Sequence, residues 1–427
     1  MNARRNERPL KVVRIIDRLI YGGPTRNVVF LTEGLAKLGF ECALITGVPA
    51  NGEADMTFWA QQYDVEPLRI GEMSRELGPR DVVVILKLWR MFKQLRPDII
   101  HTHKSKAGAA GRVAAFLYRY WTPSTLVGRP RKVRILHTFH GHIFHSYYGR
   151  LKTAVFIRIE RALAHITDCI ITVSEQQKHE IRDTFRVGLR TQFRVIPLGM
   201  DFRDAATPAG LRDQCGIGQQ EFLIGAVGRL CEVKNFSLLL QAVATARRMN
   251  PSLRLHLAFI GDGHLRPGLE TEAAELGISQ NVTFAGFCGE IDAIYPELDI
   301  AALSSLNEGT PLALIEAMGH GRPVITTEVG GYKDILGEPV SVADGFSIWA
   351  NGVSVRSGDS RGYAKALSFL VANPDLCKQM GERARHYAWQ NFSRERLIWD
   401  TAALYRELWF DTPRRDASQA TANAVAG

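Results

Sequence analysis

The sequence predicts an α/β protein with two doubly wound parallel sheets, each covered by helices on both faces. The chain has 427 residues, and a single hydrophobic core stops growing at about 250 to 300 residues, so two domains are expected. Short apolar runs alternate with helical spacings through residues 1–200, and a second such series starts at residue 222. This alternation is typical of parallel sheets. Hydrophobic residues make up 46% of the chain and charged residues 23%, as in globular proteins.

The first half begins with a strand-like run, KVVRII at 11–16, which a Gly-Gly turn and a helix expected over 25–38 follow. Further apolar runs of strand length are CALIT (42–46), DIIHTH (98–103), VRILHTF (133–139) and CIITV (169–173). The segment RVIPLGMD closes this half, and a polar stretch rich in Asp, Gly and Pro comes after it. We therefore expect an N-terminal domain over 1–200 with a hinge behind it.

A second domain is expected over 201–382. Its strand-like runs are FLIGAVG (222–228), LHLAFIGDG (255–263), NVTFAGF (281–287), DIAALSS (299–305) and PVITT (323–327). An amphipathic helix within 383–412 could cross back to the first domain, and the polar tail 413–427 is expected to be disordered. Ligands of doubly wound sheets bind outside the carboxyl ends of the strands, so two facing sheets predict a cleft between the domains.

Positive charge is concentrated in the first half of the chain. The net charge is +9, yet residues 1–200 carry 32 Lys and Arg against 17 Asp and Glu, which leaves the second half acidic. A basic half suggests an anionic partner such as phosphate, anionic lipid or nucleic acid, although a solvated basic surface would explain about half of these charges. Nucleic acid is not favoured, because no aromatic RNA-binding strand motif and no helix-turn-helix stands out.

The ends and the cysteines predict a cytoplasmic protein. Basic residues at the N-terminus lead directly into the first strand without the apolar stretch of about 7 to 15 residues that a signal peptide needs. No run approaches the roughly 18 apolar residues of a spanning helix. The six cysteines are scattered without a C-x-x-C pair, so reduced thiols are expected. A peripheral position on the inner face of the plasma membrane stays open.

The most informative segment is SSLNEGTPLALIEAMGHGRPVITT at 304–327. Thr310 followed by Pro311 has the order of an N-cap and a first helical residue. A helix that starts at the carboxyl end of a strand presents free backbone N–H groups to a diphosphate. Glu308 precedes this helix and Glu316 lies just beyond its first turn, so one carboxylate can reach a sugar and the other a ribose.

The two carboxylates and the residues around them resemble the signature of the family 4 glycosyltransferases of GT-B fold, E-x(7)-E followed by A-M-A-x-G-x-P-V. The resemblance implies that Glu308 hydrogen-bonds hydroxyls of the donor sugar and that Glu316 holds the ribose hydroxyls. It also implies that the backbone from Thr310 through Pro311 to Leu312 lies near the sugar and the phosphate. A loop glutamate and a salt-bridged helix glutamate would be the structural alternative.

A second motif, AVGRLCEVKNFSLLLQAV, joins a strand that ends at Gly228 to a helix that Asn235 can cap. Arg229 and Lys234 flank this turn, and two cations at a helix start can clamp a diphosphate leaving group. The run G-R-L-x-x-x-K-N is similar to the diphosphate-binding turn of the family. Taken alone, the two cations could simply form surface salt bridges.

Two elements of the first domain also resemble the family. Gly22 and Gly23 follow the opening strand, where the family has a glycine-rich donor-binding loop, although a tight turn would also explain them. The stretch HTFHGH resembles the T-x-H element, which carries over Thr138 and His140 and implies that His140 contacts the donor sugar. The role of His142 is unassigned.

The stretch DIIHTHKSKAG places His103, Lys104 and Lys106 at the carboxyl end of a strand, where the lysines could hold an acceptor diphosphate. Members with an H-T-H-x-x-K-A-G element often serve polysaccharide assembly, which is an analogy only. The histidines at 137, 140, 142 and 145 fit no standard zinc spacing, and no acidic cluster lies near the motifs, so neither a metal nor a cofactor is expected.

An interfacial surface is predicted by aromatic and basic residues that alternate without an acidic one over 111–134. The aromatic members are Phe116, Tyr118, Tyr120 and Trp121, and the basic ones are Arg112, Arg119, Arg129, Arg131, Lys132 and Arg134. A second set has helical spacing, with apolar Tyr147, Tyr148, Leu151, Val155, Ile159 and Leu163 between basic Arg150, Lys152, Arg158 and Arg161. Both suit an anionic membrane. The alternative is that the apolar positions pack on the sheet.

Together these features predict transfer of a hexose-type sugar from a nucleotide donor, most simply a UDP-linked one. The family resemblance implies that the transfer retains the anomeric configuration. The acceptor would be a lipid-linked saccharide, for example one on a polyprenyl diphosphate, in cell-envelope polysaccharide synthesis. The expected catalytic residues are Glu308, His140, Arg229 and Lys234. A nucleotide-sugar 2-epimerase and a catalytically silent sugar-nucleotide sensor are the rival interpretations.

Overall fold

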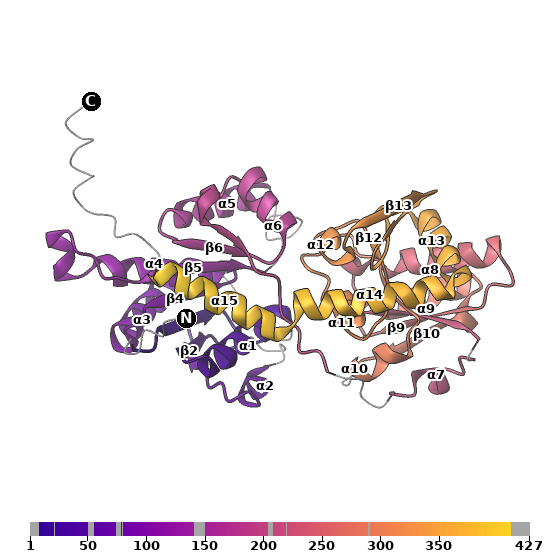
Figure 1. Cartoon of the computed structure of the whole chain (residues 1–427), viewed down its shortest axis with the longest axis horizontal. Helices are drawn as coiled ribbons and strands as arrows, with labels where there is room; N and C mark the ends of the chain where they lie inside the picture. Colours follow the sequence, from indigo (N-terminus) through magenta and orange to yellow (C-terminus); the bar gives the residue numbers. More distant parts are fainter. Residues whose placement is uncertain are drawn as a thin grey trace, which may run out of the picture. The chain divides into compact units, whose positions relative to one another are not determined.

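A computed structural model describes residues 8–20, 22–49, 55–73, 78, 80–140, 150–203, 208–218, 220–288 and 291–410, apart from the side chains of 150–152. The chain divides into two compact units (Figure 1). The first unit comprises Met1–Gly199 and Glu395–Gly427, and the second unit comprises Met200–Arg394. The predicted tail 413–427 lies outside the described residues.

The first unit contains a seven-stranded parallel sheet in the order β3-β2-β1-β4-β5-β6-β7. Its strands are β1 (Lys11–Ile16), β2 (Glu41–Thr46), β3 (Leu68–Arg69), β4 (Ile99–His103), β5 (Arg134–Phe139), β6 (Cys169–Thr172) and β7 (Phe193–Val195). The order runs outward in both directions from β1 and β4. This reversal is the switch point at which doubly wound sheets bind ligands.

Helices cover both faces of this sheet. They are α1 (Gly23–Lys37), α2 (Thr57–Gln61), α3 (Arg80–Leu95), α4 (Ser105–Tyr120), α5 (Arg150–Ala164), α6 (Glu175–His179) and α15 (Arg394–Phe410), with short turns η1 (Pro123–Val127), η2 (Glu180–Thr184) and η3 (Arg190–Gln192). Val13 packs in a core with α3 and α4, whereas its neighbour Val12 packs in a core with α1 and α15. Successive strand residues face opposite sides, so this alternation places the two helix layers.

The C-terminal helix α15 lies close against α1 within the first unit. A Cβ atom on Gly34 of α1 would come within 2.2 Å of Ile398 Cδ1, so a side chain there would force Ile398 to move. The predicted single helix over 383–410 is wrong, because α14 (Pro374–Phe392) ends before α15 begins. Ser393 is extended and forms a bridge with Met200, which interrupts the helical hydrogen bonds.

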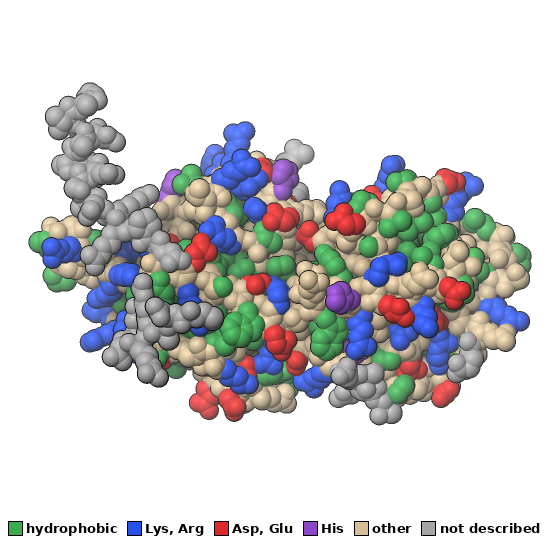
Figure 2. Space-filling view, viewed as in Figure 1, with side chains coloured by type: hydrophobic (Ala, Val, Ile, Leu, Met, Phe, Trp, Pro, Cys, Tyr) green, Lys and Arg blue, Asp and Glu red, His purple; other side chains and the backbone are tan. Residues whose placement is uncertain are grey.

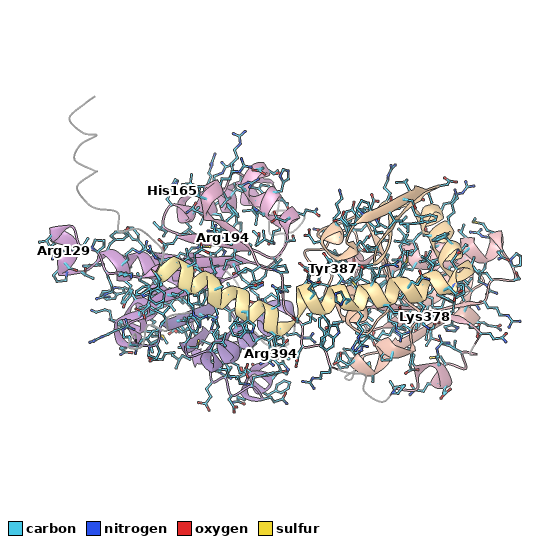
Figure 3. All side chains as sticks on the ribbon, in the orientation of Figure 1. Arg129, His165, Arg194, Lys378, Tyr387 and Arg394 are labelled. Atoms are coloured by element: carbon cyan, nitrogen blue, oxygen red, sulfur yellow. The ribbon has the colours of Figure 1, made fainter. Side chains whose placement is uncertain are left out.

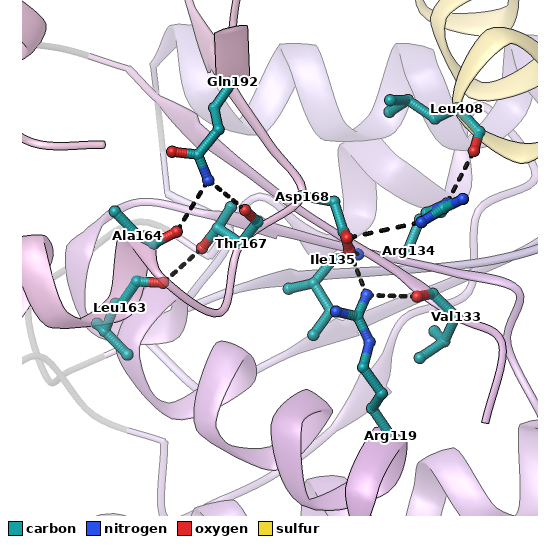
Figure 4. Close-up of polar contacts among 10 residues, drawn as sticks. All are labelled: Arg119, Val133, Arg134, Ile135, Leu163, Ala164, Thr167, Asp168, Gln192 and Leu408. Carbon is teal, nitrogen blue, oxygen red and sulfur yellow. Dashed lines mark hydrogen bonds and ion pairs between the residues drawn. The ribbon is translucent and has the colours of Figure 1, made fainter. Parts of the chain in front are cut away.

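Several basic residues of the predicted interfacial segment form internal contacts (Figure 4). Asp168 accepts hydrogen bonds from Arg119 and from the backbone N–H of Ile135, the latter at 2.6 Å, and Arg134 donates to the carbonyl of Leu408 at 2.8 Å. Arg112 is fully buried and pairs with Glu160 at 2.7 Å. These arginines therefore join α4 to α5, hold α4 and α15 to the sheet, and are not part of a uniformly solvated surface.

The second unit contains an eight-stranded sheet in the order β10-β9-β8-β11-β12-β15-β14-β13. Its strands are β8 (Phe222–Val227), β9 (Leu255–Ile260), β10 (Val282–Gly286), β11 (Ile300–Leu303), β12 (Val324–Thr327), β13 (Pro339–Ala343), β14 (Phe346–Trp349) and β15 (Gly352–Val355). The sheet is parallel from β10 to β15, and β13 and β14 add an antiparallel edge that the sequence pattern had not predicted. The order reverses at β8 and β11.

The helices of the second unit again form two layers. They are α7 (Leu211–Gln214), α8 (Phe236–Met249), α9 (Arg266–Glu275), α10 (Ile291–Ile294), α11 (Leu312–Gly319), α12 (Tyr332–Leu336), α13 (Ser360–Ala372) and α14, with turns η4 (Glu232–Lys234), η5 (Ser279–Asn281) and η6 (Tyr295–Glu297). Ile224 packs in a core with α8 and α13, and Leu223 in a core with α11 and α14. The predicted fold class, two parallel-sheet α/β domains, is confirmed.

Candidate functional site

The conspicuous polar cluster of the second unit lies where the strand order reverses, at the carboxyl ends of β8 and β11. The loop after β8 carries Arg229 and Lys234, and the loop after β11 carries Glu308. Lys234 Nζ lies 2.6 Å from Glu308 Oε1, and both side chains are mostly buried. Since this edge is the ligand-binding edge of a doubly wound sheet, the ion pair occupies the expected site.

Hydrogen bonds join the two loops that carry the ion pair. Ser305 Oγ donates to the same Glu308 oxygen at 2.7 Å, and Ser304 Oγ donates to the carbonyl of Lys234 at 2.8 Å. The backbone N–H of Leu306 donates to the carbonyl of Val233, also at 2.8 Å. The ammonium and the carboxylate are thus held in place by the loops that carry them, an arrangement that favours electrostatic stabilisation.

Two glycines allow neighbouring loops to pack closely against this pair. A Cβ atom on Gly261, after β9, would lie 2.1 Å from the carbonyl oxygen of Gly228, and one on Gly330 would lie 2.0 Å from that of Glu308. Neither position can therefore carry a side chain without moving the loop it supports. The Glu308 loop and the turn after β8 are both fixed by backbone contact.

Arg229 differs from Lys234 in its surroundings. Its side chain is exposed, and among the described residues no hydrogen bond or ion pair to its guanidinium is found. Asn235 does precede α8, in a left-handed conformation, but its side chain does not cap the helix. The predicted side-chain cap is therefore wrong, and the start of α8 is left without one.

The helix that follows Glu308 begins one residue later than predicted. Pro311 has ψ 83°, outside the helical range, so it is the N-cap and α11 starts at Leu312. The predicted roles of Thr310 as N-cap and Pro311 as first helical residue are wrong. No side chain caps the helix, and the buried Thr310 hydroxyl has no hydrogen-bond partner among the described residues. The first N–H groups of α11 therefore lack a side-chain cap.

Glu316, on the first turns of α11, is oriented by a residue that the sequence did not suggest. Tyr295, which is fully buried, donates its hydroxyl to Glu316 Oε2 at 2.8 Å. The Tyr295 ring stacks on His320, with ring centroids 5.5 Å apart. No motif marks Tyr295, because its contact depends on how η6 packs beside α11.

In the first unit, the predicted residues lie at the corresponding switch point. Gly22 and Gly23 form the start of α1 after β1, and Gly22 has φ 147°, which favours glycine. His103 ends β4 and His140 follows β5, and their imidazoles meet, with His103 Nδ1 2.8 Å from His140 Nε2. Burial lowers the pKa of His140 to about 3 and that of His103 well below its usual range, so both rings are neutral at pH 7.

The two lysines proposed for the acceptor pair with carboxylates of the same unit. Lys104 Nζ lies 3.0 Å from Asp17 Oδ1, and Lys106 Nζ lies 3.1 Å from Asp81 Oδ1. Lys104 also has φ 61°, an uncommon conformation for a residue with a side chain and one often found at functional sites. A role for either lysine in acceptor binding stays a prediction.

The described ranges contain neither a metal-binding cluster nor a membrane-spanning helix. No group of three His, Cys, Asp or Glu side chains in those ranges is arranged to hold a metal ion, while His142 and His145 lie outside them. None of the helices described there is long and apolar enough to cross a bilayer.

Comparisons with known proteins identify both halves of the chain. The profile of the family "Glycosyltransferase Family 4" matches residues 21–204, and the profile "Glycosyl transferases group 1" matches 210–387. EpsD of Bacillus subtilis is 28% identical over 363 residues, which cover 84% of this chain and 88% of that protein. The UDP-Gal:alpha-D-GlcNAc-diphosphoundecaprenol alpha-1,3-galactosyltransferase of Escherichia coli is 28% identical over 280 residues, which cover 64% and 68%.

Among solved structures, HepE of Anabaena in complex with UDP is similar over 93% of this chain and 100% of that one, with a TM-score of 0.73 and 19% identity. At this identity the similarity shows the fold, which is GT-B. The profiles cover most of the chain, and they agree with the carboxylate and diphosphate motifs at the switch point. The chain is a glycosyltransferase, and it belongs to the family 4 glycosyltransferases of GT-B fold.

Proposed function

We propose that this glycosyltransferase transfers a hexose-type sugar from a UDP-linked donor with retention of the anomeric configuration. The observation that carries the proposal is the Lys234–Glu308 ion pair at the switch point of the second sheet. An ammonium suits a diphosphate, and a carboxylate suits sugar hydroxyls. The UDP complex of HepE and the UDP-Gal donor of the Escherichia coli relative support a uridine nucleotide.

In the proposed reaction, the diphosphate binds between the starts of α8 and α11. Lys234, held beside Glu308, contacts the diphosphate together with Arg229, and Glu308 accepts hydrogen bonds from the sugar. The bond from the anomeric carbon to the phosphate oxygen breaks while the acceptor hydroxyl attacks from the same face, and the departing oxygen takes the hydroxyl proton. Fixed cations and helix N–H groups stabilise the charge that develops on the leaving group.

Slow donor hydrolysis tests this proposal without knowledge of the acceptor. The purified chain is incubated with UDP-, GDP- and ADP-linked hexoses, and release of the nucleoside diphosphate and of the free sugar's anomer is followed. We expect hydrolysis of a UDP-hexose to the α-anomer, and a much slower rate in Glu308→Gln. A 2-epimerase would instead interconvert the donor without an acceptor, and a sensor would bind without turnover.

Metal independence is the first prediction from this site. Lys234 and Arg229 supply the positive charge that a divalent cation supplies in many other transferases. We therefore expect an unchanged hydrolysis rate in excess EDTA, measured by nucleotide release. A loss of activity that Mg²⁺ or Mn²⁺ restores would contradict the proposed role of the two cations.

The proposed acceptor is a lipid-linked saccharide, as in cell-envelope polysaccharide synthesis, and the first unit is proposed to bind the inner leaflet that carries it. Exposed apolar side chains after α4 support this, with exposed fractions of 69% for Trp121, 90% for Leu126 and 73% for Val127. Arg129 lies at the tip of the same segment (Figure 3). The Escherichia coli relative acts on a diphosphoundecaprenol-linked acceptor.

A second surface of the first unit also combines exposed apolar side chains with basic ones. On α5, Val155 and Ile159 are exposed, and Figure 2 shows Lys and Arg side chains gathered over this helix. Leu163, at the end of α5, is buried, so only part of the predicted apolar stripe is free of the sheet. Tyr147 and Tyr148 lie outside the described residues.

Vesicle sedimentation tests membrane binding. Each interfacial Lys or Arg contributes about 1 kcal/mol against anionic lipid, so the protein should pellet with anionic but not neutral vesicles, and less at high salt. Leu126→Asp with Val127→Asp should release it. The matched control is Val340→Asp with Val342→Asp, which changes two exposed valines of the second unit. Protein that stays in the supernatant with both vesicle types would favour a soluble acceptor.

A further inference from the structure

A buried chain of side-chain contacts joins the C-terminal helix α15 to the carboxyl edge of the first sheet. The Tyr405 hydroxyl lies 2.6 Å from His101 Nδ1, and His101 Nε2 lies 2.7 Å from Thr138 Oγ1. Arg14 Nη2 lies 3.5 Å from the same Tyr405 hydroxyl. All four side chains are buried, and they come from β1, β4, β5 and α15.

The chemistry of these groups determines which atom donates and which accepts each hydrogen bond. A guanidinium can only donate, so the Tyr405 oxygen accepts from Arg14. Burial raises the pKa of Tyr405 to about 12, so the hydroxyl keeps its proton at neutral pH. Among the described residues, His101 Nδ1 is the acceptor found for that proton.

His101 in turn donates a hydrogen bond to Thr138 on β5. Burial, together with the nearby charge of Arg14, lowers the pKa of His101 well below its usual range, so the ring is neutral and holds one proton. Since Nδ1 accepts from Tyr405, this proton lies on Nε2 and is donated to Thr138. The tautomer of a buried histidine is thus set by a residue on α15.

The oriented ring of His101 supports the pair at the edge of the sheet. The His101 ring packs against the His103 ring, with centroids 4.2 Å apart and ring planes tilted by 36°, and His103 in turn contacts His140. His103 Nε2 and His140 Nδ1 are buried and lack hydrogen-bond partners among the described residues. Two neutral imidazoles that share one hydrogen bond offer one donor and one acceptor at these outer nitrogens. The orientation of His101 therefore affects the hydrogen-bonding group that His140 can offer to a ligand.

We propose that Tyr405 is a positioning residue for His140: it fixes the proton of His101 on Nε2 and so holds the packed rings in the arrangement in which His103 meets His140. This deepens the proposed function and rests on it, since it takes His140 as the contact of the donor sugar. The C-terminal helix is then part of the machinery of the first unit as well as of its core.

Imidazole nitrogen NMR tests the first step on the full-length protein without substrate. In long-range ¹H–¹⁵N spectra, we expect one ring with unprotonated Nδ1 and protonated Nε2, assigned to His101 by its loss in His101→Gln. Tyr405→Phe keeps the ring, which packs edge-on against Phe40, and removes the hydroxyl. It should change the His101 signals toward mixed tautomers. A wild-type proton on Nδ1, or an unchanged spectrum in Tyr405→Phe, would overturn the proposal.

The matched control is Tyr363→Phe. Tyr363 is also fully buried, and its hydroxyl lies 3.2 Å from the carbonyl oxygens of Leu303 and Ile325 in the second unit. Loss of this hydroxyl removes a comparable buried hydrogen bond but should leave the imidazole spectrum unchanged. A spectrum that changes equally in both variants would indicate general loosening of the protein and would contradict the inference.

Kinetics test the link to His140. Tyr405→Phe should lower kcat for donor turnover about tenfold with little change in KM, a smaller effect than the roughly 100-fold cost of a 1 Å misplacement. In a His140→Ala background, Tyr405→Phe should not lower kcat any further. Equal losses in both backgrounds would show a merely structural role. If no nucleotide sugar turns over, the proposed function fails, while the spectra still decide whether Tyr405 orders the rings.

Discussion

Replacing Lys234 with methionine should lower kcat/KM for the UDP-hexose about 100- to 1,000-fold, as loss of one preorganised electrostatic group does in other active sites. Methionine keeps most of the side-chain length and removes the charge. The loss should be large because Glu308, 2.6 Å from Lys234, would keep its negative charge beside the diphosphate. Nucleotide release measures turnover, and calorimetry measures UDP affinity.

A double variant separates the lost attraction from the new repulsion. Glu308→Gln in the Lys234→Met background removes the unpaired carboxylate, so UDP should bind more tightly than to Lys234→Met alone while turnover stays low. Lys365→Met is the control, because Lys365 also pairs with a carboxylate of the second unit, Asp344, but on the surface. It should leave both quantities unchanged. UDP affinity that does not recover in the double variant would argue against a diphosphate beside this ion pair.

Most strands of the two sheets could be predicted because buried parallel strands are short apolar runs with sharp ends. KVVRII, for example, coincides with β1 (Lys11–Ile16). The strand β3 and the short buried strand β15 were missed. The hairpin of β13 and β14 was missed although Asp344–Gly345 between two apolar runs is a strong hairpin signal. Its valines are exposed at the sheet edge, so they do not form the buried pattern on which the prediction relied.

The motifs predicted which residues lie at the site, but they predicted neither the caps of the two helices beside it nor the side-chain contacts made across the fold. Lys234 and Glu308 were each marked by their own motif, but their ion pair and the supporting Ser305 depend on the order of β8 and β11. Tyr405 and His101 are 304 residues apart, and no local pattern links them. For the same reason, sequence alone could not show that Arg112 is buried against Glu160.

Replacing Glu316 with alanine should weaken binding of free UDP at least about tenfold, because hydrogen bonds to a charged group contribute about 1.5 to 3 kcal/mol and 1.4 kcal/mol is tenfold in affinity. The Tyr295 hydroxyl already fixes one carboxylate oxygen, at 2.8 Å, so Glu316 is oriented before the nucleotide arrives. Tyr295→Phe should weaken binding less, since the carboxylate stays.

The ribose assignment is tested with a nucleotide that lacks the proposed partner groups. The wild-type protein should bind UDP more tightly than 2′,3′-dideoxyuridine diphosphate, and Glu316→Ala should bind both alike, because the carboxylate and the ribose hydroxyls lose the same interaction. Glu308→Gln should preserve the preference, since its carboxylate is assigned to the sugar. Calorimetric titration of the three proteins with both nucleotides measures this. If Glu316→Ala keeps the wild-type preference for UDP, another residue holds the ribose and the carboxylate of α11 has a structural role with Tyr295.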